Sequence, residues 1–200
     1  MKKYLTKLSL VALGIGFAAT MAFPARGNAA FTANNIMDDS VFNMSTMSAA
    51  QIDAFLNSFP SSCISTNNSF VSEDVVGYNP SQGFLYGSTV SAGTVIFHAA
   101  QAYDLNPQVI LATLQKEQSL VTGGAGCHYD TPPTQGSRVV ACQYAGGCVY
   151  IAMGYDCPSD CNASSTGFSR QIIRATWKLK CVQQRSLGNY NWNIQKPGWD

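Results

Sequence analysis

The stretch 106–122, NPQVILATLQKEQSLVT, decides the fold that this chain of 200 residues is expected to adopt. Asn106 can accept hydrogen bonds from the first free backbone N–H groups of a helix, and Pro107 suits the first helical position. The apolar residues that follow recur at helical spacing. We therefore predict a helix that starts at Pro107 and continues to the end of this stretch.

A single acidic residue lies on the apolar face of this helix. At about 100° per residue, three apolar side chains fall on one narrow stripe (Ile110, Leu114 and Val121), and Glu117 lies in its middle. A carboxyl group held against apolar neighbours loses hydration of its charged form, which raises its pKa and suits it to act as a general acid. Because helical glutamates usually lie on solvated faces, a solvated or structural Glu117 is the alternative.

The first 29 residues have the features of an export signal. Three lysines precede an apolar run at 8–22, and small residues at 27–29 suit cleavage. The run is short for a membrane span, and no second long apolar stretch follows it. We expect a protein that is secreted to the cell surface or periplasm and has no stable membrane span after the signal is removed.

Charge argues against a nucleic-acid partner. Removing residues 1–29 leaves eight basic and eleven acidic residues, a net charge near −3. Nucleic-acid binding needs a far higher density of bases. Six bases lie in the last third of the chain, where they could meet an anionic cell-wall polymer or simply form a solvated helix face (Arg170, Arg174, Lys178, Lys180, Arg185 and Lys196).

Cysteine usage favours disulfides over catalytic thiols. All seven cysteines follow the export signal (Cys63, Cys127, Cys142, Cys148, Cys157, Cys161 and Cys181). Because seven is odd, at least one thiol is free or pairs outside the chain. Zinc is the competing use, with Cys157 and Cys161 close together and His98 and His128 as further ligands, but paired C-x-x-C sets are missing. We expect no metal and no other cofactor.

The remaining pattern predicts a mainly α domain with long disulfide-linked loops. Amphipathic helices are expected at 49–58, 92–103 and 168–182, and the tight turn at 104–107 should pair the second of these with the 106–122 helix as a hairpin. The segment 123–167 carries five cysteines and is expected to be an irregular, functional loop. We divide the chain into the signal (1–29), a helix and loop region (30–88), a core of catalytic type (89–185) and an aromatic, Asn-rich segment (186–200) that ends as a fragment of a longer protein would.

Two aromatic clusters are candidates for sugar binding. One lies in the long loop, with Tyr150, Met153 and Tyr155, and the other follows the last helix, with Tyr190 and Trp192 between asparagines. Aromatic rings of this kind stack on sugar rings or fill a core, and the sequence favours neither use.

The segment 114–121, LQKEQSLV, resembles the catalytic helix of the lysozyme-like superfamily, which includes lytic transglycosylases and other peptidoglycan hydrolases of exported bacterial proteins. The resemblance implies a lysozyme-like fold, with Glu117 as the catalytic acid and Ser119 one position later than the serine of the usual Glu-Ser pair. The family has a Gly-Leu-Met-Gln type motif that lines the groove, and its nearest counterpart here is 151–155, IAMGY. The resemblance covers about residues 90–182.

The resemblance implies cleavage of the bond between N-acetylmuramic acid (MurNAc) and N-acetylglucosamine (GlcNAc) in peptidoglycan, with one glutamate as acid and base. The substrate-binding residues expected are Ser119, Tyr150, Met153, Tyr155, Tyr190 and Trp192. A hydrolase would need a second carboxylate, and the sequence singles none out, which favours the lytic transglycosylase reaction. The alternative is a non-catalytic adhesin or wall-binding module on the same scaffold.

Overall fold

The computed structural model describes residues 38–43, 45–68, 90–124, 126–129, 134–136, 138–139, 146–158 and 160–192. The chain is mainly helical and carries disulfides in its irregular segments, which confirms the predicted class of fold at that level. The predicted signal, residues 1–29, lies outside the described residues. None of the helices within them is long and apolar enough to cross a membrane.

The α-helices in chain order are α1 (Asp39–Phe42), α2 (Ala49–Asn57), α3 (Ala92–Ala102), α4 (Pro107–Gln118) and α5 (Phe168–Ser186). Short 3-10 helices are η1 (Thr66–Asn68), η3 (Val149–Ile151) and η4 (Ala163–Ser165). The strands β1 (Thr134–Gln135), β2 (Arg138–Val139) and β3 (Cys161–Asn162) form one small antiparallel sheet in that order, in which Thr134 pairs with Val139 and Val139 with Cys161. The sheet lies within the segment that was expected to be wholly irregular.

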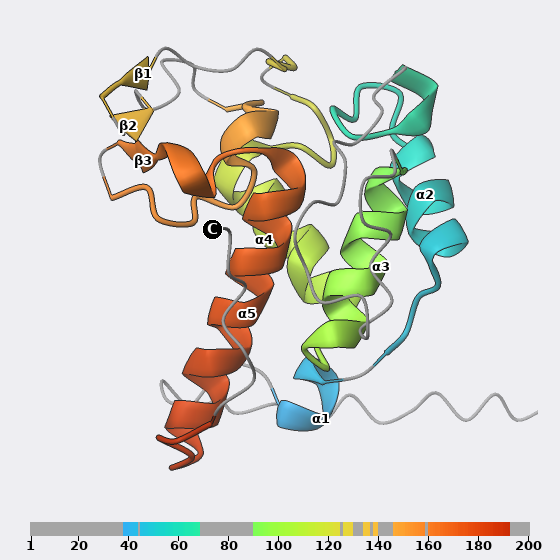
Figure 1. Ribbon diagram of the computed structural model, residues 1–200. Helices are drawn as coiled ribbons and strands as arrows, with labels where there is room; N and C mark the ends of the chain where they lie inside the picture. Colours follow the sequence, from blue (N-terminus) through green and yellow to red (C-terminus); the bar gives the residue numbers. More distant parts are fainter. Residues whose placement is uncertain are drawn as a thin grey trace, which may run out of the picture. The chain divides into compact units, whose positions relative to one another are not determined.

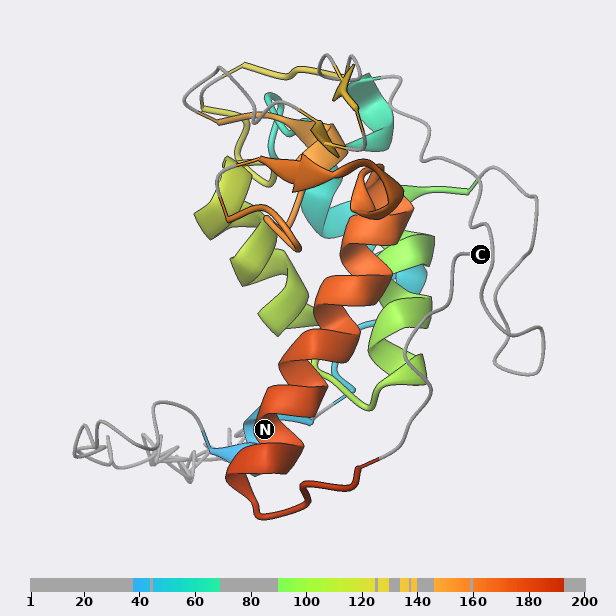
Figure 2. The ribbon, with the colours of Figure 1, turned by 60° about the vertical axis from the view of Figure 1, so that its left-hand side comes forward.

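Helix α3 is the centre of the core. It packs against α2, α4 and α5, and Figures 1 and 2 show it running beside α5. Its side chains Val95, Ile96 and Ala99 are fully buried. The turn after α3 brings α4 back against it, which confirms the predicted hairpin.

Side-chain caps explain why the helices start where the sequence predicts. Ser48 and Gln51 form a reciprocal capping box at α2, and Ser91 accepts a hydrogen bond from the N–H of Thr94 at α3. At α4, the side-chain oxygen of Asn106 accepts from the N–H of Gln108 at 2.9 Å. The amide of Asn106 also donates to the carbonyl of Val41 at 2.9 Å, so one cap holds α1 as well.

Helix α4 ends earlier than predicted, at Gln118. Ser119 adopts the left-handed conformation with φ of 56°, and the N–H of Leu120 bonds to the carbonyl of Leu114 at 3.3 Å. This turn directs Leu120 and Val121 into the core, where both are buried. Val121 is therefore buried because the turn after the helix directs it into the core. It does not belong to the apolar stripe of the helix, as was predicted.

Helix α5 is not the plain amphipathic helix that the sequence predicted. Its apolar residues Phe168 and Ile172 are buried as expected, but Arg174, which was assigned to a solvated face, is buried too. The reason is that the segment from η3 to η4 covers that side of the first turns of α5. The guanidinium of Arg174 donates to the hydroxyl of Ser165 in that segment at 2.8 Å.

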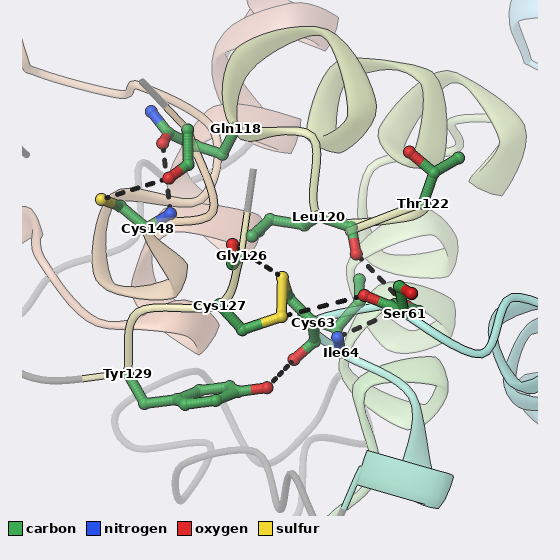
Figure 3. The surroundings of a disulfide bond; sticks show 12 residues. Ser61, Cys63, Ile64, Gln118, Leu120, Thr122, Gly126, Cys127, Tyr129 and Cys148 are labelled. Carbon is green, nitrogen blue, oxygen red and sulfur yellow. Dashed lines mark hydrogen bonds between the residues drawn. A yellow bond between two sulfur atoms is a disulfide. The ribbon is translucent and has the colours of Figure 1, made fainter. Parts of the chain in front are cut away.

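Disulfides fix the irregular segments, and for two of them both cysteines are described. Cys63 and Cys127 are joined across a separation of 64 residues, and Cys157 and Cys161 across 4 (Figure 3 shows the first). The phenol of Tyr129 donates to the carbonyl of Cys63 at 3.0 Å. Cys148 is disulfide-bonded as well, whereas Cys181 is a free, buried thiol in α5. The preference for disulfides and the presence of a free thiol are both confirmed.

The junction between α2 and α3 depends on a close approach at Gly93. The carboxylate of Asp53 accepts from the hydroxyl of Ser91 at 2.6 Å and from the N–H of Gly93 at 2.9 Å. A Cβ atom at position 93 would meet the Asp53 carboxylate and would lie 2.7 Å from the carbonyl oxygen of Ala49. Only glycine allows the two helices to pass at this distance.

Replacing Gly93 by alanine should destabilise the protein although alanine is the better helix former. In an open helix the change gains about 1 kcal/mol of stability, whereas overpacking costs about 1–3 kcal/mol. Urea unfolding followed by circular dichroism measures the change. Gly124→Ala is the control, because a Cβ atom there meets open space. A stability gain in Gly93→Ala would contradict the close packing.

The two disulfides should differ in their contribution to stability. Loop-closure entropy predicts a loss of about 4 kcal/mol when Cys63 and Cys127 are both replaced by alanine, but about 2 kcal/mol for the short Cys157–Cys161 loop. Denaturant unfolding of the two double variants measures both. Equal losses would show that chain entropy does not set their effect.

Stability should fall as the pH is lowered through about 6.5, the usual pKa of histidine. Partial burial lowers the pKa of His98 in the folded protein, so the unfolded chain takes up the proton first. The contribution is complete above the unfolded pKa and is lost as the pH falls toward the folded one. A thermal melting series should show this slope, and His98→Gln should flatten it; an unchanged slope in the variant would contradict the assignment.

Candidate functional site

Glu117 lies in the last turn of α4 and opens into a cavity. The expectation that it is buried on the apolar stripe is wrong, because its side chain is 33 % exposed. The helix ends one residue later, so this turn projects beyond the core that buries Leu114. The carboxylate therefore faces a cavity, where a substrate could reach it.

The cavity lies between the end of α4, the middle of α5 and the loop after η3. Its volume is about 460 Å³. The lining residues are Thr113 and Glu117 from α4, Met153, Gly154, Tyr155 and Asp156 from the loop, and Ala175, Lys178 and Leu179 from α5. Three segments that are far apart in sequence thus contribute both charged and apolar groups to one site.

Gly154 brings the loop backbone close to Glu117. A Cβ atom at position 154 would lie 3.2 Å from Oε2 of Glu117, and the residue has a φ of 63°. Both facts favour glycine, since side chains disfavour this backbone region and would press on the carboxylate. The predicted site residues Met153 and Tyr155 flank this contact and line the same cavity as Glu117.

A second carboxylate, Asp156, lines the cavity. Its Oδ2 accepts a hydrogen bond from the hydroxyl of Ser165 at 3.1 Å, and that hydroxyl accepts one from Arg174 at 2.8 Å. Asp156 adopts a φ of 58° and is exposed. The buried Arg174 and Ser165 thus orient an acidic group at the edge of the cavity that holds Glu117.

Cationic and phenolic groups complete the electrostatics of the cavity. Nζ of Lys116 lies 2.7 Å from Oε1 of Glu117, and this hydrogen bond, with the attraction between the charges, raises the pKa of Lys116. Burial raises the pKa of Tyr155, the positive charge of Arg174 opposes this, and the charge of Asp156 adds to it. The phenol of Tyr155 therefore stays protonated at neutral pH and can donate a hydrogen bond.

The structure separates the other predicted binding residues from this cavity. Ser119 caps the end of α4, and Tyr150 belongs to η3; neither is among the described residues that line the cavity. Tyr190, which is 76 % exposed, and Trp192 line a different hollow after α5. Tyr155 and Tyr190 therefore line two separate cavities.

Metal binding has no visible support in the described part of the chain, where no three or more His, Cys, Asp or Glu side chains cluster closely enough to hold an ion. Cys157 and Cys161, considered above as zinc ligands, are joined to each other. A disulfide-bonded sulfur offers no thiolate to a metal.

Sequence reasoning missed three polar residues at or behind the cavity. The sequence did not single out Asp156, and it gave Lys178 only as one of six bases in the last third of the chain, although both residues line the cavity. Gln171 was missed too, but a signal existed: it falls between Phe168 and Ala175 at helical spacing, so a polar residue occupies an apolar stripe.

Comparison with known proteins gives no further guide. No protein-family profile matches the chain, and neither the curated proteins nor the solved structures contain a significant match. The function must therefore be argued from the site.

Proposed function

We propose that this protein is an exported peptidoglycan-cleaving enzyme that acts on the MurNAc–GlcNAc glycosidic bond, with Glu117 as the acid and base. The observation that carries the proposal is the placement of Glu117 on a cavity beside the Met153–Tyr155 segment. The likeness of this helix to that of the lysozyme-like superfamily gives the reaction class. The disulfides fit an oxidising compartment, which agrees with export.

The cavity offers the groups that glycoside cleavage needs. A general acid must reach the glycosidic oxygen, and the carboxyl of Glu117 is accessible from the cavity. The half-buried ring of Tyr155 provides apolar surface for a sugar ring beside the buried Met153, and the exposed Lys178 can attract the carboxylates of the peptidoglycan peptides.

In the one-acid reaction, protonated Glu117 gives its proton to the glycosidic oxygen as the bond to the muramic acid carbon breaks. The resulting carboxylate then removes the proton of the muramic acid C6 hydroxyl, whose oxygen closes an anhydro ring on that carbon. Hydrolysis would instead need a carboxylate that activates water or bonds to the sugar. Asp156 is the described carboxylate that lines the cavity with Glu117, so it is the candidate for that role.

A wall-binding module without catalysis is the second candidate, and one contact favours it. Nζ of Lys116 bonds to Oε1 of Glu117 at 2.7 Å, so the carboxyl group already has a partner and is not free to reach a glycosidic oxygen. Lys116 itself is 81 % exposed, so its side chain is free to leave the carboxylate when a substrate enters. Catalysis requires that the pair opens, whereas binding alone does not.

Replacing Glu117 by glutamine should abolish cleavage and preserve the fold. The amide keeps the shape of the side chain but cannot donate a proton, and loss of a general acid costs about 10²–10⁴-fold in rate. Purified peptidoglycan is digested with the exported form, and the products are identified by mass spectrometry. Glu73→Gln is the matched control, since Glu73 is the only other glutamate of the chain.

Anhydromuropeptides from the parent, and none from Glu117→Gln, would support the one-acid reaction. Reducing-end products that disappear in both Glu117→Gln and Asp156→Asn would establish hydrolysis with two carboxylates. If the folded parent protein binds peptidoglycan but releases no fragments, the proposal of an enzyme is overturned and the wall-binding module takes its place.

A further inference from the structure

We propose that Gln171 is the positioning residue of this site: its buried amide fixes the Met153–Tyr155 segment against Glu117. The proposal rests on the proposed function, since it concerns how the same site is held in shape. Gln171 does not line the cavity and would not touch a sugar. It lies behind the loop, at the end of the first turn of α5.

The amide of Gln171 makes four hydrogen bonds to the backbone. Its Oε1 accepts from the N–H of Met153 at 3.3 Å and from that of Tyr155 at 2.9 Å. Its Nε2 donates to the carbonyls of Tyr155 at 3.0 Å and Ser165 at 2.6 Å. The side chain is fully buried, so water cannot replace these partners.

The bonded groups flank the contact with Glu117. Met153 and Tyr155 stand on either side of Gly154, whose missing Cβ atom would lie 3.2 Å from the carboxylate. Because both neighbours are fixed, the backbone position of Gly154 is fixed too. That position sets how closely the loop approaches the carboxylate of Glu117. The same amide holds Ser165, whose hydroxyl donates to Asp156. One side chain thus positions the loop beside both carboxylates of the cavity.

Glutamine can bind both the N–H and the carbonyl groups of the loop, because its side-chain amide carries an acceptor and a donor. Its side chain is also long enough to reach the loop. A carboxylate would place charge against two carbonyls, and an apolar residue would leave four buried backbone groups without partners. The loop after η3 is short and rich in turns, so it has few hydrogen bonds of its own with which to hold this shape.

The test compares Gln171→Met with Gln183→Met. Gln183 is also a buried glutamine on α5, but it donates to Asp39 of α1 at 2.6 Å and not to the loop after η3. Both changes remove a buried amide from the same helix and keep the side-chain length. Because the chain has only two glutamates, labelling the glutamate carboxyl carbon gives two NMR signals, and Glu117→Gln assigns them.

In Gln171→Met the carboxyl signal of Glu117 should move, and kcat on peptidoglycan should fall about 10- to 100-fold in the folded enzyme with KM changed less. Gln183→Met should leave both unchanged. The NMR measurement does not depend on activity. A parent without cleavage would therefore overturn the proposed function, while the movement of the Glu117 signal would still decide the role of Gln171.

An unmoved Glu117 signal in folded Gln171→Met would overturn the proposal, whatever the activity. If that variant does not fold, Gly154→Ala tests the same contact from the opposite side, because the added Cβ atom must displace either the loop or the carboxylate. A Glu117 signal and a kcat that both match the parent in Gly154→Ala would equally overturn it.

Discussion

Buried polar side chains need hydrogen-bond partners, and several of those on α5 find them in segments that are distant in the sequence. Gln171 binds the loop after η3, and Arg174 binds Ser165. Farther along the helix, the ammonium group of Lys180 donates to Asn43 and to Asp104, and Gln183 donates to Asp39. The helix therefore holds the loops in place through directed bonds, and the apolar core alone would not fix them.

This constraint explains why the cavity has its shape. The apolar contacts of α3 place α4 and α5 but leave the last turn of α4 beyond the core. The loop after η3 lies against that turn because its backbone is bonded to α5. Glu117 is accessible because the helix that carries it ends at the edge of the core. Its neighbours in the loop are fixed because their backbone is bonded to α5.

The sequence predicted what depends on local pattern. The starts of α2, α3 and α4 follow from Ser48, Ser91 and Asn106, whose capping bonds reach only two or three residues along the chain. Burial of Glu117 was predicted wrongly, because the pattern could not show that Ser119 would stop the helix. Capping by a left-handed serine has no strong sequence signal, in contrast to glycine at the same position.

The site itself was predictable only in part. Met153 and Tyr155 line the cavity of Glu117, whereas Tyr190 and Trp192, which the sequence gave as a second cluster, line another hollow. Asp156 and Lys178 join the site through contacts between distant segments, and residue spacing within one helix or loop carries no information about such contacts. The lysozyme-like assignment and the glycan substrate remain predictions of the motif.

The bonds of α1 to α5 have a consequence for how the chain acquires its structure. Lys180 and Asn43 are 137 residues apart, and Gln183 and Asp39 are 144 apart. Contacts between residues this far apart in the sequence form only after both helices have been made. Among the described helices, α1 comes first along the chain and α5 last, so a partly made chain lacks the bonds that join them.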